Sequence, residues 1–190
     1  MLARALLIAA VLAAAPAHAE PARDPLARLM KSDGDSLCFR RDYDAAHLKR
    51  HPGQATQAAL LSFRNDAVRI MLRQKGDEHY IVAGCEYRKG AGYDTSGNLM
   101  IKSFKKPAGY DCIVIVAPSS AEEGGYVLFD PATDGRSLVL YLQSPITARA
   151  GLSGKATAYN VKLGREDREF RLARTDSAAC KAMEEGLERP

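Results

Sequence analysis

The sequence contains no tryptophan, and after its N-terminal segment it contains no long hydrophobic run. The first absence disfavours a stacking platform for sugars. The second excludes a later transmembrane helix, which needs about 20 consecutive apolar residues. No two cysteines have the C-x-x-C spacing. A thioredoxin-like redox motif and a cysteine zinc knuckle are therefore excluded as well.

Catalytic and nucleotide-binding motifs are also absent. The chain has no G-x-S-x-G, no P-loop and no G-x-G-x-x-G sequence. Its formal charge is only +4, and its basic and acidic residues are interspersed. Without a polybasic tract, the sequence does not predict nucleic-acid binding. We expect no cofactor, and nothing in the sequence names a reaction.

The N-terminus has the three parts of a bacterial secretory signal peptide. Met1–Arg4 supplies a positive charge, Ala5–Ala15 is a short apolar helix, and Ala17-His18-Ala19 places small residues at the cleavage site. We expect cleavage after Ala19, with cleavage after Ala17 as the nearest alternative. The sequence therefore predicts a periplasmic or secreted protein, with a signal peptide at 1–19, a flexible N-terminal arm at 20–35 and a single β-rich domain at 36–190.

All four cysteines follow this cleavage site. An even number of cysteines in an oxidising compartment favours disulfides. Of the three possible pairings we prefer Cys38–Cys180, which would tie the two ends of the domain together, and Cys85–Cys112, which would join the edges of two predicted strands.

Hydrophobic periodicity favours a mainly β fold. Val68, Ile70 and Leu72 alternate with polar residues, which is typical of a half-buried strand. They belong to a predicted hairpin of residues 55–64 and 67–75 that turns at Asn65-Asp66. We expect one antiparallel β-barrel or β-sandwich with one or two short helices. Further strands are predicted at 36–43, 79–87, 98–104, 111–117 (buried on both faces), 125–130, 137–143, 156–163 and 168–174, helices at 44–50 and 178–187, and a loop at 144–154.

The strongest candidate for a binding site lies near the first predicted helix and comprises Arg41, Tyr43, Asp44, His47 and His51. His47 and His51 are four residues apart, so they share one helical face at a spacing that suits metal ligands. The metalloprotease pattern requires Glu after the first His, and Leu48 stands there. A metal site would need a third ligand, for which Asp42, Asp44 and His79 are candidates.

The segment Cys38-Phe39-Arg40-Arg41-Asp42-Tyr43-Asp44, with His47-Leu48 and His51-Pro52, resembles the opening of a family of uncharacterised exported proteobacterial proteins. The resemblance covers less than a tenth of the chain, and the family has no assigned activity. It implies an exported β-rich domain and nothing about a substrate.

The leading functional hypothesis is a non-enzymatic exported binding or interaction protein whose partner is a periplasmic protein or a small ligand. A specific form of it is an inhibitor of a secreted hydrolase. The alternatives are a periplasmic hydrolase with a carboxylate or histidine site, and a metal-binding protein that uses His47 and His51.

The first prediction concerns processing of the chain. We expect the exported protein to begin at Glu20, because Ala17-His18-Ala19 matches the small-residue pattern that precedes cleavage. Intact mass spectrometry of protein recovered from a bacterial periplasm measures this directly. A chain that begins at His18 would favour the alternative cleavage site, and an unprocessed chain would contradict the prediction.

Overall fold

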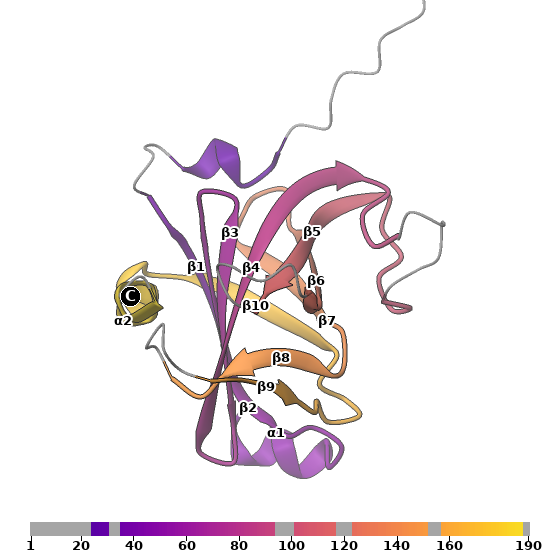
Figure 1. The fold of residues 1–190 in the computed structure, drawn as a ribbon, viewed down its shortest axis with the longest axis vertical. Coiled ribbons are helices and arrows are strands. Elements are labelled where there is room, and N and C mark those ends of the chain that lie inside the picture. Colours follow the sequence, from indigo (N-terminus) through magenta and orange to yellow (C-terminus); the bar gives the residue numbers. More distant parts are fainter. Residues whose placement is uncertain (1–23, 31–34, 94–100, 117–122, 152–156, 188–190) are drawn as a thin grey trace, which may run out of the picture.

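The computed structural model describes residues 24–30, 35–93, 101–116, 123–151 and 157–187, and it is mainly β (Figure 1). The signal peptide predicted at 1–19 lies outside the described residues. The strands are β1 (Leu37–Asp42), β2 (Thr56–Arg64), β3 (Ala67–Gln74), β4 (Asp77–Lys89), β5 (Ala108–Ile115), β6 (Glu123–Pro131), β7 (Ser137–Leu142), β8 (Ile146–Arg149), β9 (Ala158–Val161) and β10 (Glu169–Thr175). The helices are a short 3-10 helix (Ala27–Leu29), α1 (Ala45–Arg50) and α2 (Ala178–Leu187).

Eight of these strands form a closed antiparallel β-barrel. From β1 to β7 each strand pairs with the next one along the chain, and β10 closes the barrel by pairing with both β7 and β1. Strands β8 and β9 form a separate hairpin that joins β4 at the single pair Tyr80–Arg149. The sequence left barrel and sandwich open, and the structure shows the barrel.

Strand alternation fills the barrel with apolar side chains. Val68, Ile70 and Leu72 are fully buried, which confirms the inward face predicted for this strand. Tyr110 and Phe129 stack with ring centroids 4.3 Å apart near the middle of this core. The other large aromatic side chains inside are Phe39, Phe63 and Phe170.

The predicted hairpin of β2 and β3 is confirmed, and its turn explains the sequence there. Asn65 and Asp66 have φ values of 48° and 57°. Two consecutive left-handed residues are the mark of a type I′ turn, whose twist matches that of the flanking strands. Asn and Asp tolerate this conformation better than other non-glycine residues.

Both predicted disulfides are present in the structure. Cys38–Cys180 lies outside the barrel and fastens α2 to β1, with Cα atoms 5.9 Å apart. A second apolar cluster surrounds it and includes Leu60, Met71 and Met183. Cys85 and Cys112 are direct register partners on β4 and β5.

The predicted strand at 111–117 is confirmed as β5 within its described residues, but burial on both of its faces is not. Cys112 and Val114 point inward and are buried, whereas Ile113 and Ile115 are 45% and 41% exposed. These two side chains point outward, and within the described part of the chain nothing packs over them closely enough to bury them. An apolar residue composition therefore did not reveal which face of this strand is covered.

Two other predictions about local structure are wrong. The loop expected at 144–154 contains β8, which pairs with β9. Of the strand expected at 98–104, residues 98–100 lie outside the described residues and 101–104 form a turn, in which the Phe104 amide donates to the Ile101 carbonyl. Phe104 packs on the outer face of the barrel beside Gly109, where a Cβ atom would come within 2.7 Å of its ring.

Part of the segment expected to be a flexible arm is packed against the barrel. Leu26 is fully buried in the main core, and the Tyr110 hydroxyl donates a hydrogen bond to the Asp24 carboxylate. Burial raises the pKa of Tyr110, so its hydroxyl stays protonated as a donor. Figure 1 shows the 3-10 helix at one end of the barrel and α1 at the other.

Removing the outer disulfide tests how far it stabilises the barrel. A Cys38→Ala, Cys180→Ala variant should lose up to about 5 kcal/mol of unfolding free energy, because the bond closes a loop of 142 residues in the unfolded chain. Urea unfolding measures the loss, and amide exchange should rise more in α2 than in β3. A loss below about 1 kcal/mol would contradict a stabilising role for this bond.

Candidate functional site

The candidate site lies where two neighbouring strands separate. β1 and β10 pair at only three positions, the last of which is Arg40 with Ala173. Beyond that pair β1 continues along β2 as far as Asp42, while β10 runs along β7 from Glu169. The two strands therefore diverge toward the α1 end of the barrel, and side chains fill the gap between them.

This gap contains a hollow of about 290 Å³. Arg41 and Tyr43 line it from the β1 side, and Glu169 and Arg171 line it from β10. The remaining lining residues come from α1 and the two loops beside it: His47, His51, Gln54 and Glu166.

One wall of the hollow is a ladder of three rings. His47 lies in α1, Tyr43 precedes the helix and His51 caps its C-terminus, and because they are spaced four residues apart their rings lie one above another. The centroids of Tyr43 and His47 are 4.7 Å apart, and those of His47 and His51 are 4.3 Å apart. Asp44 is the N-cap of the helix and accepts a 2.6 Å hydrogen bond from the His47 amide. Asp44 therefore positions the ladder and does not line the hollow.

Each histidine is oriented by one hydrogen bond from its ring. The distance from His47 Nε2 to Gln54 Oε1 is 3.1 Å, and the distance from His51 Nδ1 to Glu166 Oε2 is 2.8 Å. Gln54 in turn donates to the Thr56 carbonyl. Among the described residues, His47 Nδ1 and His51 Nε2 make no side-chain hydrogen bond. These two ring nitrogens are the ones available to a ligand.

A buried carboxylate joins the two loops that lie beside the site. Asp167 is fully buried and accepts hydrogen bonds from the amides of Ala55, Thr56 and Gly164 at 2.9–3.2 Å. It thereby joins the turn before β10 to the chain that enters β2, although the two are more than a hundred residues apart. A Cβ atom on Gly164 would lie 2.4 Å from the Gly53 carbonyl oxygen, so this close approach requires glycine.

The charges around the hollow are unevenly matched. Glu166 faces His51, and Glu169 lies 3.4 Å from Arg171. Arg41 has no carboxylate within ion-pair distance in the described part of the chain, and its guanidinium lies 5.3 Å from the centroid of the Tyr43 ring. Burial raises the pKa of Tyr43, an effect that Arg41 partly opposes. The hollow therefore contains a protonated tyrosine hydroxyl and an arginine without a carboxylate partner among the described residues.

The structure brings together four of the five residues that the sequence singled out: Arg41, Tyr43, His47 and His51. It places the fifth, Asp44, at the helix cap. The third metal ligands considered do not join them: Asp42 pairs with Arg40, and His79 contacts Tyr159 on β9. Within the described ranges, no three His, Cys, Asp or Glu residues gather in a way that could hold a metal ion.

The half of the site that comes from β10 and the turn before it could not be recognised from the sequence. Glu166, Glu169 and Arg171 lie in the highly charged stretch Gly164-Arg165-Glu166-Asp167-Arg168-Glu169-Phe170-Arg171, which looks like a solvated turn and the start of a strand. Only long-range contacts, the pairing of β10 with β1 and the hydrogen bonds of Asp167 to Ala55 and Thr56, place this stretch beside α1. Asp167 carries no signal that distinguishes it from the charged residues around it.

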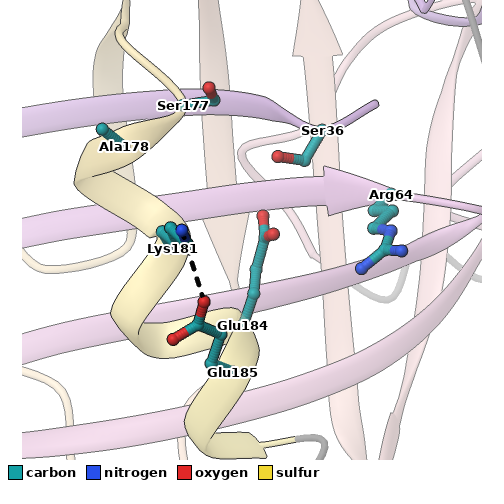
Figure 2. A pocket seen from close by; sticks show the side chains of 7 residues that line it. All are labelled: Ser36, Arg64, Ser177, Ala178, Lys181, Glu184 and Glu185. Carbon is teal, nitrogen blue, oxygen red and sulfur yellow. Dashed lines mark ion pairs between the residues drawn. The ribbon is translucent and has the colours of Figure 1, made fainter. Parts of the chain in front are cut away.

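Two further hollows lie on the described surface. One, of about 500 Å³, shares Glu166 and Glu169 with the first and extends toward Ile101–Ser103. The other, of about 380 Å³, lies between α2 and the barrel (Figure 2). There Lys181 pairs with Glu185 along the helix, and Ser62 donates to Glu184. The bond from Ser62 fastens α2 to β2, and none of the residues singled out by the sequence lines this hollow.

Comparisons with protein-family models, with curated proteins and with solved structures find no match to this chain. No described helix is long and apolar enough to cross a membrane. The two disulfides fit a protein of an oxidising compartment, such as the periplasm or the cell exterior.

Removing the buried carboxylate tests how the site is held together. Asp167→Ala should lower the unfolding free energy by about 3 kcal/mol, because it leaves three backbone amides without their charged acceptor. Asp134→Ala is the matched control, since that exposed turn carboxylate accepts one amide hydrogen bond. Equal losses in urea unfolding for the two variants would contradict the role assigned to Asp167.

Proposed function

We propose that this protein is a non-enzymatic exported binding protein, and that the hollow lined by Arg41, Tyr43, His47 and His51 is its binding site. The observation that carries the proposal is the convergence of these four side chains, including two ring nitrogens that make no side-chain hydrogen bond within the described residues, in one hollow on a disulfide-linked barrel. A specific form of this role is inhibition of a secreted hydrolase, for which a compact scaffold linked by disulfides is well suited.

The arrangement favours binding over catalysis. A hydrolytic site needs a nucleophile or an activated water beside its general base. The hollow has no Ser, Cys or Thr among its lining residues. The two carboxylates that line it each face a cationic or imidazole partner. Its side chains are therefore better arranged to hold a ligand than to transform one.

One contact favours the second candidate function, a hydrolase. Glu166 orients His51 at 2.8 Å, which is how a carboxylate prepares a histidine to act as a general base on water. In this reading His51 is the base and Glu166 its orienting partner. The two functions make opposite predictions for Glu166→Gln. Hydrolysis would fall by roughly a hundredfold or more, whereas partner binding would change little.

The test of the binding function compares matched variants in capture experiments. The mature chain, a His47→Ala, His51→Ala variant and a Lys49→Ala, Arg50→Ala control are immobilised and exposed to periplasmic extract. The control residues lie on the same helix, are exposed and do not line the hollow. We expect the histidine variant to bind its partner at least tenfold more weakly, because it removes two of the three rings that form one wall of the site, and the control to retain its affinity.

The captured partner is identified by mass spectrometry and its affinity measured by calorimetry with each purified variant. Equal affinity for the mature chain and the histidine variant would remove the hollow as the binding site. Circular dichroism of both variants establishes that they are folded, so that a loss of binding is not a loss of structure.

A further inference from the structure

We propose that the hollow recognises a carboxylate group on a small, singly charged acidic ligand, and that Arg41 is the residue that anchors it. The inference rests on the proposed binding function and names the chemical class of the ligand.

The first step is the charge that remains after the internal pairs are formed. Glu166 is engaged by His51 and lies 4.0 Å from Arg165, and Glu169 is engaged by Arg171. Arg41 remains as the lining cation without a carboxylate partner in the described part of the chain. Its neighbour Arg40 differs, because it forms an ion pair with Asp42 at 2.6 Å. Of two adjacent arginines on one strand, one is thus paired with a carboxylate and the other is not.

The second step is the balance of donors and acceptors. The donors that line the hollow are the Arg41 guanidinium and the Tyr43 hydroxyl. The ring N–H of each histidine already donates, to Gln54 or to Glu166, so the second nitrogen of a neutral ring is an acceptor that a ligand hydroxyl can meet. The amide of Gln54 is already used at both of its ends, by His47 and by the Thr56 carbonyl. A guanidinium and a hydroxyl donor without a carboxylate partner bind an acceptor group. A carboxylate, which accepts and does not donate, meets this requirement.

The third step separates a carboxylate from a phosphate. The planar fork of one guanidinium matches the two oxygens of a carboxylate. A phosphate dianion needs further positive charge, and here it would lie beside Glu166 and Glu169, which also line the hollow. The balance of one unmatched cation and two nearby carboxylates therefore favours a ligand with a single negative charge.

The fourth step concerns how the rest of the ligand is held. His47 lies between Tyr43 and His51 in the ladder, so its faces are already covered. The rings therefore offer their edges, and a ligand is held by hydrogen bonds more than by stacking. A volume of about 290 Å³ is at the lower limit for small-molecule sites, so it admits a group about the size of one sugar ring.

The test measures binding of glucuronate, of its neutral match glucose, of acetate and of inorganic phosphate by NMR titration of the mature chain. We expect glucuronate and acetate to shift the Arg41 Nε resonance and the Tyr43 amide, and glucose and phosphate to bind at least tenfold more weakly. Acetate tests binding of the carboxylate alone, and glucuronate tests binding of a carboxylate on a sugar ring. Comparison of the two affinities shows whether the ring contributes to binding.

The matched variants are Arg41→Gln and Arg40→Gln, which remove the same charge from adjacent positions of β1. Arg41→Gln should weaken glucuronate binding roughly tenfold or more, and Arg40→Gln should leave it within about twofold. Arg41→Lys retains the charge but lacks the planar fork, so its affinity should lie between those of the parent and Arg41→Gln. Amide spectra of each variant establish that the barrel is intact.

Equal binding of glucuronate and glucose, equal losses in Arg40→Gln and Arg41→Gln, or no shift with any carboxylate at millimolar concentration would each overturn the inference. These outcomes are separable from failure of the binding function. A partner that is lost in the histidine variant but unaffected by Arg41→Gln would leave the hollow as a binding site and refute only the carboxylate. A histidine variant that retains both its partner and its affinity for carboxylates would refute both the binding site and the carboxylate inference.

Discussion

Closure of the barrel by β10 is the constraint on which the rest of this structure depends. The first seven strands each pair with their neighbour in sequence, so they require only local hairpins. β10 comes last and must pair with β1, more than 120 residues earlier, over only three positions. The Cys38–Cys180 disulfide lies at one end of this short seam and connects β1 to the helix that follows β10. The covalent bond is thus placed at the shortest strand pairing of the barrel.

The same short seam creates the hollow. Because β1 and β10 separate after Arg40 and Ala173, the α1 end of the barrel would open if nothing filled the gap. Two elements fill it. The ring ladder on α1 closes one side, and Asp167 joins the turn before β10 to the start of β2 through backbone amides. The two ends of the seam are therefore held by different means. The disulfide connects α2 to β1 at one end, and the hydrogen bonds of Asp167 connect the turn before β10 to the start of β2 at the other.

The local parts of this fold could be predicted from the sequence, and the parts that depend on distant contacts could not. Period-two alternation located the β2–β3 hairpin, because the turn and the inward face are encoded within twenty residues. β8 was missed because it has only four residues and joins β4 at a single pair. The exposure of Ile113 and Ile115 was missed for a related reason: an outward apolar residue is buried only if another segment covers it, and strand periodicity does not indicate which segment does so. In the site, helical spacing located His47 and His51, while Glu166 and Arg171 come from a stretch that only long-range contacts, the β1–β10 pairing and the bonds of Asp167, place nearby.

The side chains that line the hollow are held in place by their neighbours, and this order affects the free energy of binding in a site of small volume. Each lining histidine is held by a neighbouring ring and by a hydrogen bond, and the loops below it are joined through a fully buried carboxylate. Side chains that are already ordered lose little conformational entropy when a ligand arrives, and that entropy is one of the main costs of association. Arg41 is the exception, because its guanidinium lies against Tyr43 and has no carboxylate within ion-pair distance among the described residues. If the hollow binds a ligand as proposed, one unmatched charge in an otherwise fixed frame favours discrimination by the sign and placement of charge more than by shape, since the frame does not adapt to a larger or neutral ligand.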